Sequence, residues 1–409
     1  MKKLLLLGGG HAEIPLIQAA QELGYYVITT GNAKEGLGHP YANKNVFADF
    51  SDKEAMLALA KSEAVDAVCS GCNDFALLST AYVCEKLGLP GHDSFETSLQ
   101  IHHKDKYRAL ATRLGIETPK AISVYNEDDF EDALKNLRFP IIVKPVDLTG
   151  GKGILRANNR EEALVAYKNA TGRTRESHIV VEEFVTGTNH GFSAYLVNQK
   201  VAFYFADNEQ YYQNKYMVSG ANTPSTTSAK GLAQLVTDSE KIAKELNLVD
   251  GILHIQYIER DDGTPVIIEI CRRPPGDLYI KFVKYATGID YPKFLMLAET
   301  GDERRKEICD TQFIEESAAE IRRHNRHEHS PYWLRHCVMA DREGIVKDVE
   351  FSDAIQRNII EKFMWFKPGE QITDKMYYKA GIVFLRFETL EEMQQKTAEM
   401  TKLIKVIVK

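Results

Sequence analysis

The sequence predicts an open α/β domain at the N-terminus, followed by two parts of α+β character that are richer in β-strands. Up to about residue 100, short apolar strands alternate with helical segments, whereas β-favouring segments dominate the middle third of the chain. The length of 409 residues fits roughly two to three domains, each large enough to bury its own core. We therefore expect domains over residues 1–104, 105–308 and 309–409.

The N-terminal domain is expected to consist of strand-helix-strand units. Its predicted elements are, in order, a strand at 4–7, a glycine turn at 8–10, a helix at 12–23, a strand at 26–29, a strand at 46–47, a helix near 53–62 and a strand at 67–68. Because the four leucines at 4–7 are followed by glycines and not by a cleavage site, we interpret them as a buried strand and not as a signal peptide. A helix over 104–114 is expected to lead away from this domain.

The central and C-terminal parts are expected to be built mainly of strands. Their predicted elements are strands at 141–143, 179–182, 191–197, 201–205, 333–339 and 382–387, and a final amphipathic helix over 390–404. The shift in composition near residue 104 marks the first boundary, and the short strands after about residue 311 mark a third, smaller domain.

Composition narrows the class of protein. The net charge of -7 argues against nonspecific binding to nucleic acid. No segment approaches the roughly 20 apolar residues that span a bilayer, so we expect a cytoplasmic protein without a membrane partner. Six cysteines in a chain of this length do not predict a disulfide scaffold. Domain interfaces leave room for a homodimer, although no sequence pattern marks one.

A glycine loop with two lysines is the first candidate site. An apolar run at 139–143 ends in Lys144, and Gly150, Gly151, Lys152 and Gly153 follow before a second apolar segment. Glycine lets backbone N–H groups approach an anion, and lysine supplies compact positive charge for phosphoryl oxygens. A P-loop needs a helix after the glycines, whereas this pattern is strand, loop, strand. The segment therefore predicts either a phosphate cradle or an ordinary glycine hairpin.

The N-terminal glycines do not form a convincing dinucleotide fingerprint. Glu13 stands where the third glycine of the Rossmann pattern is required, and the end of the second predicted strand offers no acid for a ribose. Two interpretations of the loop stay open. It either binds an anionic substrate at the start of the following helix or is a tight strand-to-helix turn.

A predicted β-hairpin carries the second candidate site. If Asp262-Gly263 forms a two-residue turn, residues whose numbers sum to 525 lie opposite each other, so Gln256 faces Glu269 and His254 faces Cys271. Alternation then places these four side chains and Arg273 on one face. A carboxylate suits Mg²⁺ and an arginine suits a phosphoryl or carboxylate group, but Glu269 and Arg273 could equally form a simple ion pair.

Taken in order, these motifs resemble the ATP-grasp superfamily. The residues that carry the resemblance are Lys104-Asp105-Lys106, Lys144 with its glycine loop, Val181-Glu182-Glu183-Phe184-Val185 and residues 269–277. The resemblance covers essentially the whole chain. It implies a pre-ATP-grasp α/β domain, a two-part ATP-grasp fold with a lid over about 120–185, and a small C-terminal α+β domain similar to those of biotin carboxylase-like and L-amino acid ligase proteins.

The resemblance also implies ATP and Mg²⁺ as cofactors and assigns their contacts. Lys106 and Lys144 would contact the α- and β-phosphates, with the loop of Gly150, Gly151, Lys152 and Gly153 above them. Glu182, Glu183, Phe184 and Val185 would read the adenine, with Glu182 near its amino group. Glu269 would hold Mg²⁺, and Arg273 would steady the transferred phosphoryl group.

Three positions depart from the family pattern. Gln256 stands where a second metal-binding glutamate is usual, Cys271 where an asparagine is frequent, and Asn189 where a ribose-contacting glutamate is common. A neutral amide attracts Mg²⁺ less than a carboxylate does, so Gln256 is expected to weaken the metal site.

The activity that the resemblance implies is ADP-forming ligation of a small-molecule carboxylate to an amine through an acylphosphate. Lys144, Glu269 and Arg273 would neutralise charge, and Arg273 with backbone N–H groups near Gly276 would hold the acyl oxygen. The acceptor pocket is expected near residues 209–226. Tyr216 and its neighbours Tyr211 and Tyr212 either line that pocket or are half-buried strand aromatics. Two other functions stay open: a carboxyphosphate-forming enzyme of biotin carboxylase-like or purine-pathway type, and a nucleotide-binding protein with a decayed metal site.

Two further motifs are better explained by structure than by a site. Cys69-Ser70-Gly71-Cys72 has redox spacing, but the flanking residues predict two thiols at a strand end. The basic run at 322–329 could bind a metal or an anion, but such runs are more often a solvated face.

Overall fold

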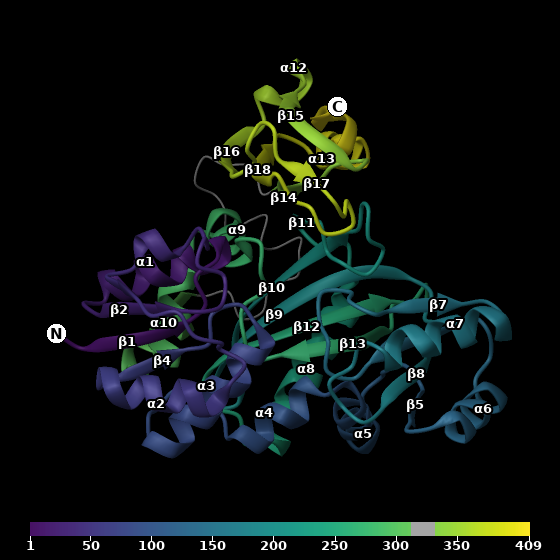
Figure 1. The fold of residues 1–409 in the computed structure, drawn as a ribbon, viewed down its shortest axis with the longest axis horizontal. Coiled ribbons are helices and arrows are strands. Elements are labelled where there is room, and N and C mark those ends of the chain that lie inside the picture. The colour runs from purple at the N-terminus through teal and green to yellow at the C-terminus, as the bar shows by residue number, and fades with distance from the viewer. Residues whose placement is uncertain (312–331) are drawn as a thin grey trace.

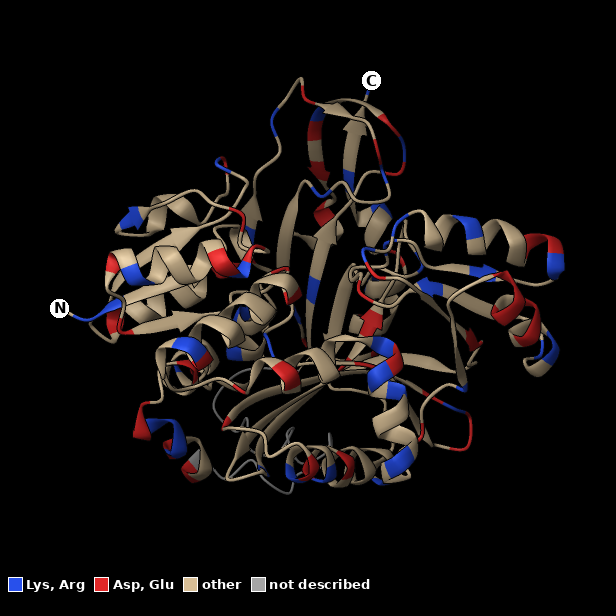
Figure 2. Cartoon of the chain, turned by 60° about the horizontal axis from the view of Figure 1, so that its bottom comes forward, with Lys and Arg blue, Asp and Glu red and all other residues tan. Residues whose placement is uncertain are grey.

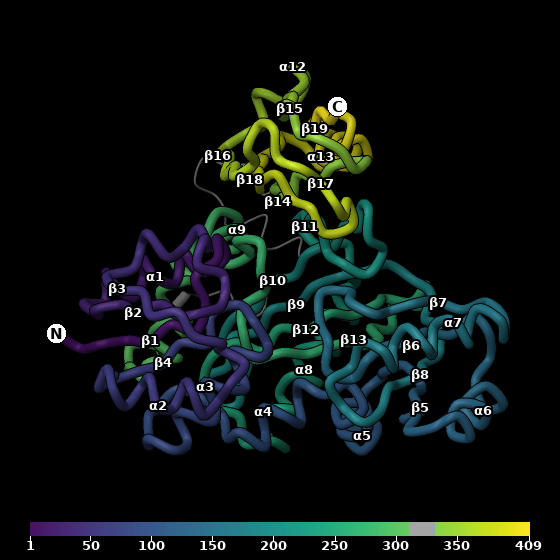
Figure 3. Tube along the Cα trace, viewed as in Figure 1, coloured from purple at the N-terminus to yellow at the C-terminus, as the bar shows by residue number. Residues whose placement is uncertain are grey.

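This computed structural model describes residues 1–311 and 332–409. The described residues contain four β-sheets with helices packed beside them (Figure 1). They divide into an N-terminal parallel sheet, a small antiparallel sheet, a long central sheet and a three-stranded sheet near the C-terminus. The mixed α/β and α+β class expected from the sequence is confirmed. Figure 3 traces the chain from the N-terminal domain through the small sheet and back to the centre.

The N-terminal domain has strand order β3-β2-β1-β4, with β1 parallel to both β2 and β4. Its elements are β1 (Lys3–Leu7), η1 (His11–Glu13), α1 (Ile14–Glu22), β2 (Tyr26–Thr30), η2 (His39–Tyr41), β3 (Lys44–Asn45), α2 (Lys53–Glu63), β4 (Ala67–Cys69), α3 (Asp74–Leu87) and α4 (Phe95–His102). Leu4 to Leu7 are fully buried because helices cover both faces of the parallel sheet. The strand expected at 46–47 lies two residues earlier.

The small sheet has order β5-β8-β6-β7 and is antiparallel throughout. It comprises β5 (Ala121–Val124), α6 (Glu127–Asn136), β6 (Ile141–Pro145), β7 (Leu155–Ala157), α7 (Arg160–Thr171) and β8 (Ile179–Glu183). The side chains of Asn126 and Asn159 cap α6 and α7, so each helix begins at a defined residue. The glycine loop joins β6 to β7, which confirms the strand-loop-strand pattern and the exclusion of a P-loop.

The central sheet has order β13-β12-β9-β10-β11-β14-β18-β16. Its first part and the helices beside it are α5 (Lys104–Leu114), β9 (Thr188–Val197), β10 (Lys200–Gln210), β11 (Gly220–Thr223), α8 (Ala229–Glu245), β12 (Gly251–Glu259) and β13 (Pro265–Cys271). Apolar residues of α5 and α8, including Leu110 and Leu235, pack with Phe192 and Leu253 of the sheet. This packing fixes one face of the sheet and leaves polar side chains on the other face at the lid side.

Three elements connect the central sheet to the C-terminal part: α9 (Tyr279–Thr287), α10 (Tyr291–Glu299) and η3 (Glu303–Thr311). Leu295 and Met296 of α10 share a core with Leu16 and Ile17 of α1. The last residues of the expected central domain, 105–308, therefore pack against the N-terminal domain.

The C-terminal part contributes to two sheets: its strands β14, β18 and β16 extend the central sheet, because β14 pairs with β11, and β17, β15 and β19 form the three-stranded sheet. Its elements are β14 (Tyr332–Val338), β15 (Gly344–Phe351), α12 (Asp353–Gln356), β16 (Ile359–Met364), β17 (Gln371–Ile372), β18 (Gly381–Phe387), α13 (Leu390–Ala398), α14 (Met400–Leu403) and β19 (Ile404–Val408). The helix predicted over 390–404 is confirmed except that it is divided at Glu399 into α13 and α14 and ends at Leu403. The β-branched residues at the end of the chain form β19, which pairs with β15 and buries Ile404 and Val406.

Acidic and basic residues both lie on the outer helices of the molecule (Figure 2). In the described ranges, no helix has the length and apolar character needed to cross a membrane. The basic run at 322–329 lies outside the described residues. The six cysteines are free thiols; Cys69 is buried at the end of β4, as the strand-end interpretation expects.

Candidate active site

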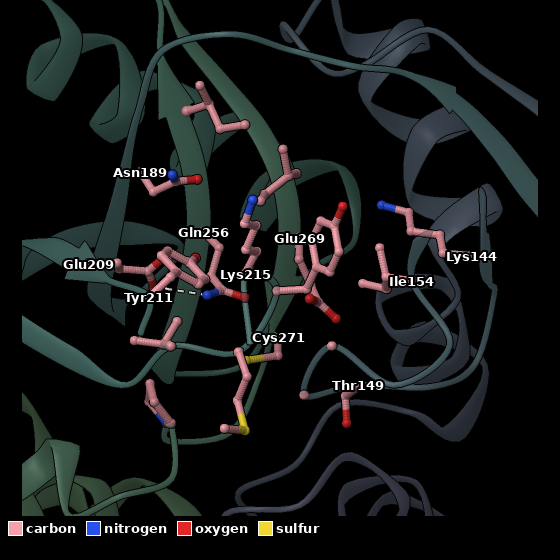
Figure 4. A pocket seen from close by; sticks show the side chains of 18 of the residues that line it. Lys144, Thr149, Ile154, Asn189, Glu209, Tyr211, Lys215, Gln256, Glu269 and Cys271 are labelled. Atoms are coloured by element: carbon pink, nitrogen blue, oxygen red, sulfur yellow. Dashed lines mark hydrogen bonds between the residues drawn. The ribbon is translucent and has the colours of Figure 1, made fainter. Parts of the chain in front are cut away.

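A cavity of about 1000 Å³ lies where the small sheet faces the central sheet. Its wall combines strands β6 and β8, the glycine loop, the polar face of β10, β12 and β13, and the segment from 215 to 218. Residues 72–74 of the N-terminal domain and Arg335 and Lys379 of the C-terminal part close the far end. The N-terminal, central and C-terminal parts therefore all contribute residues to one cavity. Figure 4 shows its middle, where Lys144, Glu209 and Glu269 lie around the same space.

Lys144 belongs to a buried charge cluster on the cavity wall. Its Nζ lies 2.6 Å from Oε2 of Glu182, and Nε of Arg108 lies 2.9 Å from Oε1 of the same carboxylate. Burial lowers the pKa of Lys144 to about 8. Burial opposes the charge on Glu182, but Arg108 and Lys144 together lower its pKa. The Glu182 side chain is thus held by two cations, while Glu183, Phe184 and Val185 line the cavity beside it.

The lysine at the start of α5 that reaches the cavity is Lys104, so the expectation for Lys106 is wrong. Lys104 is buried, and its Nζ lies 2.7 Å from the carbonyl oxygen of Leu148 and 3.4 Å from Oε1 of Glu269. Lys106 does not line the cavity, and its nearest acid is the exposed Glu96 at 4.0 Å. Residues two apart on a helix point in nearly opposite directions, so only one of the two lysines can face the cavity.

The glycine loop contributes Thr149, Gly150 and Gly151 to the cavity wall, but not Lys152 or Gly153. Gly150 and Gly151 have φ angles of 65° and 75°, which favour glycine. A β-carbon at Gly151 would lie 2.6 Å from the carbonyl oxygen of Tyr216, whereas one at Gly150 would meet nothing within 4 Å. The loop therefore rests on Tyr216 at Gly151, and Tyr216 itself lines the cavity.

This difference makes the two glycines a matched pair for mutagenesis. Both alanine variants carry the strain of a left-handed backbone, about 1 kcal/mol. Only Gly151→Ala also pushes the loop away from Tyr216. We expect ATP binding, measured by calorimetry, to weaken clearly more in Gly151→Ala than in Gly150→Ala. Equal affinities of the two variants would show that the loop does not need this contact.

The polar face of the β12–β13 hairpin lies on the cavity wall as predicted. Gln256 pairs with Glu269 and His254 with Cys271, which confirms the register, and all four line the cavity with Arg273. The predicted two-residue turn is wrong, however. Arg260 N–H bonds to the Thr264 carbonyl oxygen around a three-residue loop, and a bulge at Ile268 restores the register.

Arg273 links the hairpin to the N-terminal domain. Its Nη2 lies 2.5 Å from Oδ2 of Asp74, the first residue of α3. Both side chains line the cavity. The simple ion pair weighed from the sequence would join Arg273 to Glu269; instead Glu269 pairs with Lys104 and Arg273 with Asp74. Sequence reasoning missed Asp74, although its place just after the predicted strand at 67–68 is a signal for a site residue.

Asp277 lies at the far end of the cavity in a cluster of cations. Its carboxylate pairs with Lys379, with Arg335 at 3.8 Å and with His11 at 3.4 Å. Although burial opposes ionisation, Lys379 and His11 hold the pKa of Asp277 far below its ordinary value. Gly276, expected near the acyl group, lines the cavity beside it. Arg335 and Lys379 were missed because the central sheet brings them there from the C-terminal part.

Asp207 and Glu209 of β10 form an acidic part of the cavity wall, and of the two only Asp207 lies outside the segment expected to form the acceptor pocket. Tyr279 donates a hydrogen bond of 2.8 Å to Asp207, while Tyr211 and Gln256 donate bonds of 2.5 and 2.8 Å to Glu209. Burial, with the nearby Glu209, raises the pKa of Asp207 to about 7. Burial also raises the pKa of Glu209. Asn189 of the neighbouring strand β9 lines the cavity as well.

The N-terminal glycine loop does not offer a free anion site in this structure. Glu13 accepts hydrogen bonds from the N–H groups of Gly10, at 2.9 Å, and Cys72, at 3.0 Å. The carboxylate of the chain itself therefore satisfies these donors, and the tight-turn interpretation holds. Tyr212 bonds to His336 and does not line the cavity, in contrast to Tyr211 and Tyr216.

Comparison with known proteins identifies the centre of this arrangement, because residues 103–277 match the family model for the ATP-grasp domain. This segment is an ATP-grasp domain. Curated relatives include the formate-dependent phosphoribosylglycinamide formyltransferases of Burkholderia mallei and Prochlorococcus marinus, each 29% identical over 45% of this chain. The alignments cover 46% and 48% of those proteins, so the chain spans about half the length of the curated relatives it matches.

Solved structures share the fold over the whole chain. An L-amino acid ligase from Bacillus licheniformis superposes with a TM-score of 0.80 at 19% identity, covering 100% of this chain and 99% of the other. A phosphoribosylglycinamide synthetase from Anaerococcus prevotii gives 0.73 at 24% identity, with both chains covered completely. At these identities the likeness shows the fold of the chain and not a substrate.

The residues at the centre of the cavity fit a magnesium ion that also binds water and phosphate. Glu269 supplies a carboxylate oxygen, and Gln256 gives its N–H to Glu209, which leaves its amide oxygen for another partner. Within residues 1–311 and 332–409, no group of three or more His, Cys, Asp or Glu residues could hold a metal ion. A metal at this site would therefore depend on ligands from the nucleotide.

Proposed function

We propose that this chain is an ATP-dependent ligase that joins a small carboxylic acid to an amine through an acylphosphate and releases ADP and phosphate. The observation that carries the proposal is a single cavity lined by an ATP-grasp domain's glycine loop and lysines and, at its other end, by Arg273, Arg335 and Lys379. The first group suits a nucleoside triphosphate. The second suits an anionic substrate beside it.

The nucleotide would lie between the two sheets. Glu183, Phe184, Val185 and Asn189 line the part of the cavity assigned to the adenosine, with Ile142 and Ile258 as apolar walls. Lys104, Lys144 and the loop at Gly150 and Gly151 are assigned to the phosphates, and Glu269 with Gln256 to Mg²⁺. Support for ATP with Mg²⁺ comes from the family, since a biotin carboxylase domain from Hydrogenobacter thermophilus with this fold is a complex with MgADP.

The chain's own residues would then act by charge and alignment. Lys144 and Lys104 neutralise the phosphate oxygens, and Arg273, held by Asp74, orients the substrate carboxylate toward the γ-phosphate. Mg²⁺ at Glu269 would withdraw charge from the transferred phosphoryl group. The carboxylate oxygen attacks the γ-phosphorus, and the bond from that phosphorus to the bridging oxygen of ADP breaks. The amine then attacks the acyl carbon and phosphate leaves.

A carboxyphosphate-forming enzyme is the second candidate, because bicarbonate is also a small anion that the arginines would accept and the same biotin carboxylase domain is a complex with bicarbonate. A screen of ADP release separates the candidates. Each carboxylic acid is tested with and without amines, and bicarbonate is tested alone. The ligase predicts ADP release that depends on an organic acid and a product of the summed mass less water. ADP release with bicarbonate alone would favour the second candidate, and none with any acid would favour a nucleotide-binding protein without catalysis.

Lys144 should give nucleotide binding a characteristic pH dependence. Its pKa is lowered to about 8 by burial, so in the free protein it loses its positive charge as the pH rises through that value. We expect the affinity for ATP to fall over that pH range, as measured by calorimetry. In Lys144→Arg the guanidinium keeps its charge, and the fall should disappear. An unchanged pH profile in this variant would show that another group titrates.

The cytoplasmic location and the homodimer stay predictions. The cavity has a volume of about 1000 Å³ and must also hold the nucleotide. The space that is left suits an acid and an amine that are small molecules.

A further inference from the structure

Asp207 differs from almost all other carboxylates of the cavity in having no cationic partner. Asp74 pairs with Arg273, Glu182 with Lys144, Glu183 with Arg260, Glu269 with Lys104, and Asp277 with Lys379. Within the described ranges, Asp207 and Glu209 are the cavity carboxylates that form no ion pair. Asp207 is only 1% exposed. A buried carboxylate without a counter-ion is costly, and a cation arriving in the cavity would relieve that cost.

The strand register places Asp207 in line with the residues assigned to the metal. Glu269 pairs with Gln256, Gln256 with Gly191, and Gly191 with Asp207, so these four residues form one row across four neighbouring strands. Residues directly opposite each other share a face of the sheet. Two strand spacings separate the backbones of Gln256 and Asp207, roughly 10 Å.

The row has a gap at Gly191 that the Asp207 carboxylate overhangs. A β-carbon at Gly191 would lie 2.9 Å from Oδ2 of Asp207, so this side chain leans over the glycine toward Gln256. The absence of a side chain at position 191 thus gives the Asp207 carboxylate the space that it occupies. An acid activated near Glu269 would thus have its acyl carbon approached from the Asp207 side.

On the basis of the function proposed above, we propose that Asp207 and Glu209 form the subsite for a positively charged primary amine and that Asp207 is the base that takes one proton from its ammonium group. The neutral amine nitrogen then forms a bond to the acyl carbon, and the bond between that carbon and the phosphate oxygen breaks. The second proton lost by the nitrogen leaves on the phosphate. Asp207 returns its proton to solvent.

The surroundings of Asp207 suit this role better than those of Asp277. Burial and Glu209 raise the pKa of Asp207 to about 7, while the hydrogen bond from Tyr279 and the charge of Arg335 act in the opposite direction. His254 is connected to Asp207 only through other side chains: it shares a hydrogen bond with Ser193, and Ser193 bonds to the Tyr279 hydroxyl. Asp277, held by Lys379 and His11, has its pKa far below the ordinary value and cannot take a proton near neutral pH.

Asp207→Asn separates the two halves of the reaction. Hydroxylamine is largely neutral near neutral pH and traps an acylphosphate without a base. The assay contains ATP, hydroxylamine and the acid that stimulates ADP release. In this assay we expect Asp207→Asn to form the hydroxamate at the wild-type rate. Its rate of amide formation with the alkyl ammonium substrate should fall about 10²-fold or more. Asp261→Asn, at an exposed turn, makes the same chemical change outside the cavity and should match the wild type in both assays.

Tyr279→Phe gives a second test. It changes a pH profile that would stay the same if Asp207 had only a structural role. Because the Tyr279 hydroxyl lowers the pKa of Asp207, its removal should move the rise of amide formation with pH to a higher value, with hydroxamate formation unchanged. Normal amide formation by Asp207→Asn would overturn the proposal and leave the ligase standing. Equal losses with amine and with hydroxylamine would also overturn it. If the wild type forms neither hydroxamate nor ADP with any acid, the proposed function is wrong, and the assignment of the amine subsite is then wrong as well.

Discussion

Glu269→Gln is expected to lower acid-dependent ADP formation at least about 10²-fold, because it removes the carboxylate best placed for Mg²⁺. The amide keeps the shape of the side chain but loses its charge. The neighbouring position 256 is already an amide, so the variant would have two neutral ligands on adjacent strands. The change also removes the partner of Lys104, whose Nζ lies 3.4 Å from the carboxylate.

The measurement is the rate of ADP release as a function of Mg²⁺ concentration. Loss of a metal ligand predicts a higher Mg²⁺ requirement, and binding of Mn²⁺ in the presence of ADP, followed by electron paramagnetic resonance, should weaken in parallel. Glu117→Gln is the matched control, since Glu117 is exposed and does not line the cavity. A Glu269→Gln enzyme with normal turnover and normal Mn²⁺ binding would contradict the assignment.

Glu182→Gln is expected to destabilise the protein by about 3 to 5 kcal/mol, because it leaves two buried cations without their anion. Arg108 and Lys144 both pair with this carboxylate, and all three side chains are buried. The effect should be read from the midpoint of thermal unfolding, which falls by several degrees for such a change.

Lys144→Met makes the contrast sharper. This change leaves the Arg108–Glu182 pair intact, so we expect a small loss of stability together with a large loss of ATP affinity. If both variants lost stability equally, the cluster would act as one structural unit. If Lys144→Met bound ATP normally, Lys144 would not be a phosphate ligand.

The sequence was most informative where local pattern decides the structure. The glycine loop between two strands, the helix from Lys104 to Leu114 and the cross-strand pair of Gln256 and Glu269 all follow from periodicity and turn chemistry. In the β12–β13 hairpin an error in the turn did not change the predicted pairing of the site residues. The turn has one residue more than predicted, but the bulge at Ile268 compensates, so the site register is the predicted one.

Residues that reach the site from distant parts of the chain could not be predicted in this way. Asp74 comes from the start of α3, and Arg335 and Lys379 come from the C-terminal part because β14 continues the central sheet. The choice between Lys104 and Lys106 depends on the rotation of α5 relative to the cavity, which tertiary packing sets. Asp207 lies in an apolar-looking strand, and only its burial without a counter-ion reveals its chemistry.

Transfer of oxygen from the acid to phosphate tests the central claim most directly. The acid that stimulates ADP release is labelled with oxygen-18 in its carboxylate, and the inorganic phosphate formed with the amine is analysed by mass spectrometry. An acylphosphate intermediate predicts one labelled oxygen in each phosphate, since the carboxylate oxygen that attacks the γ-phosphorus leaves with it. Phosphate without the label, formed alongside the amide, would contradict the account.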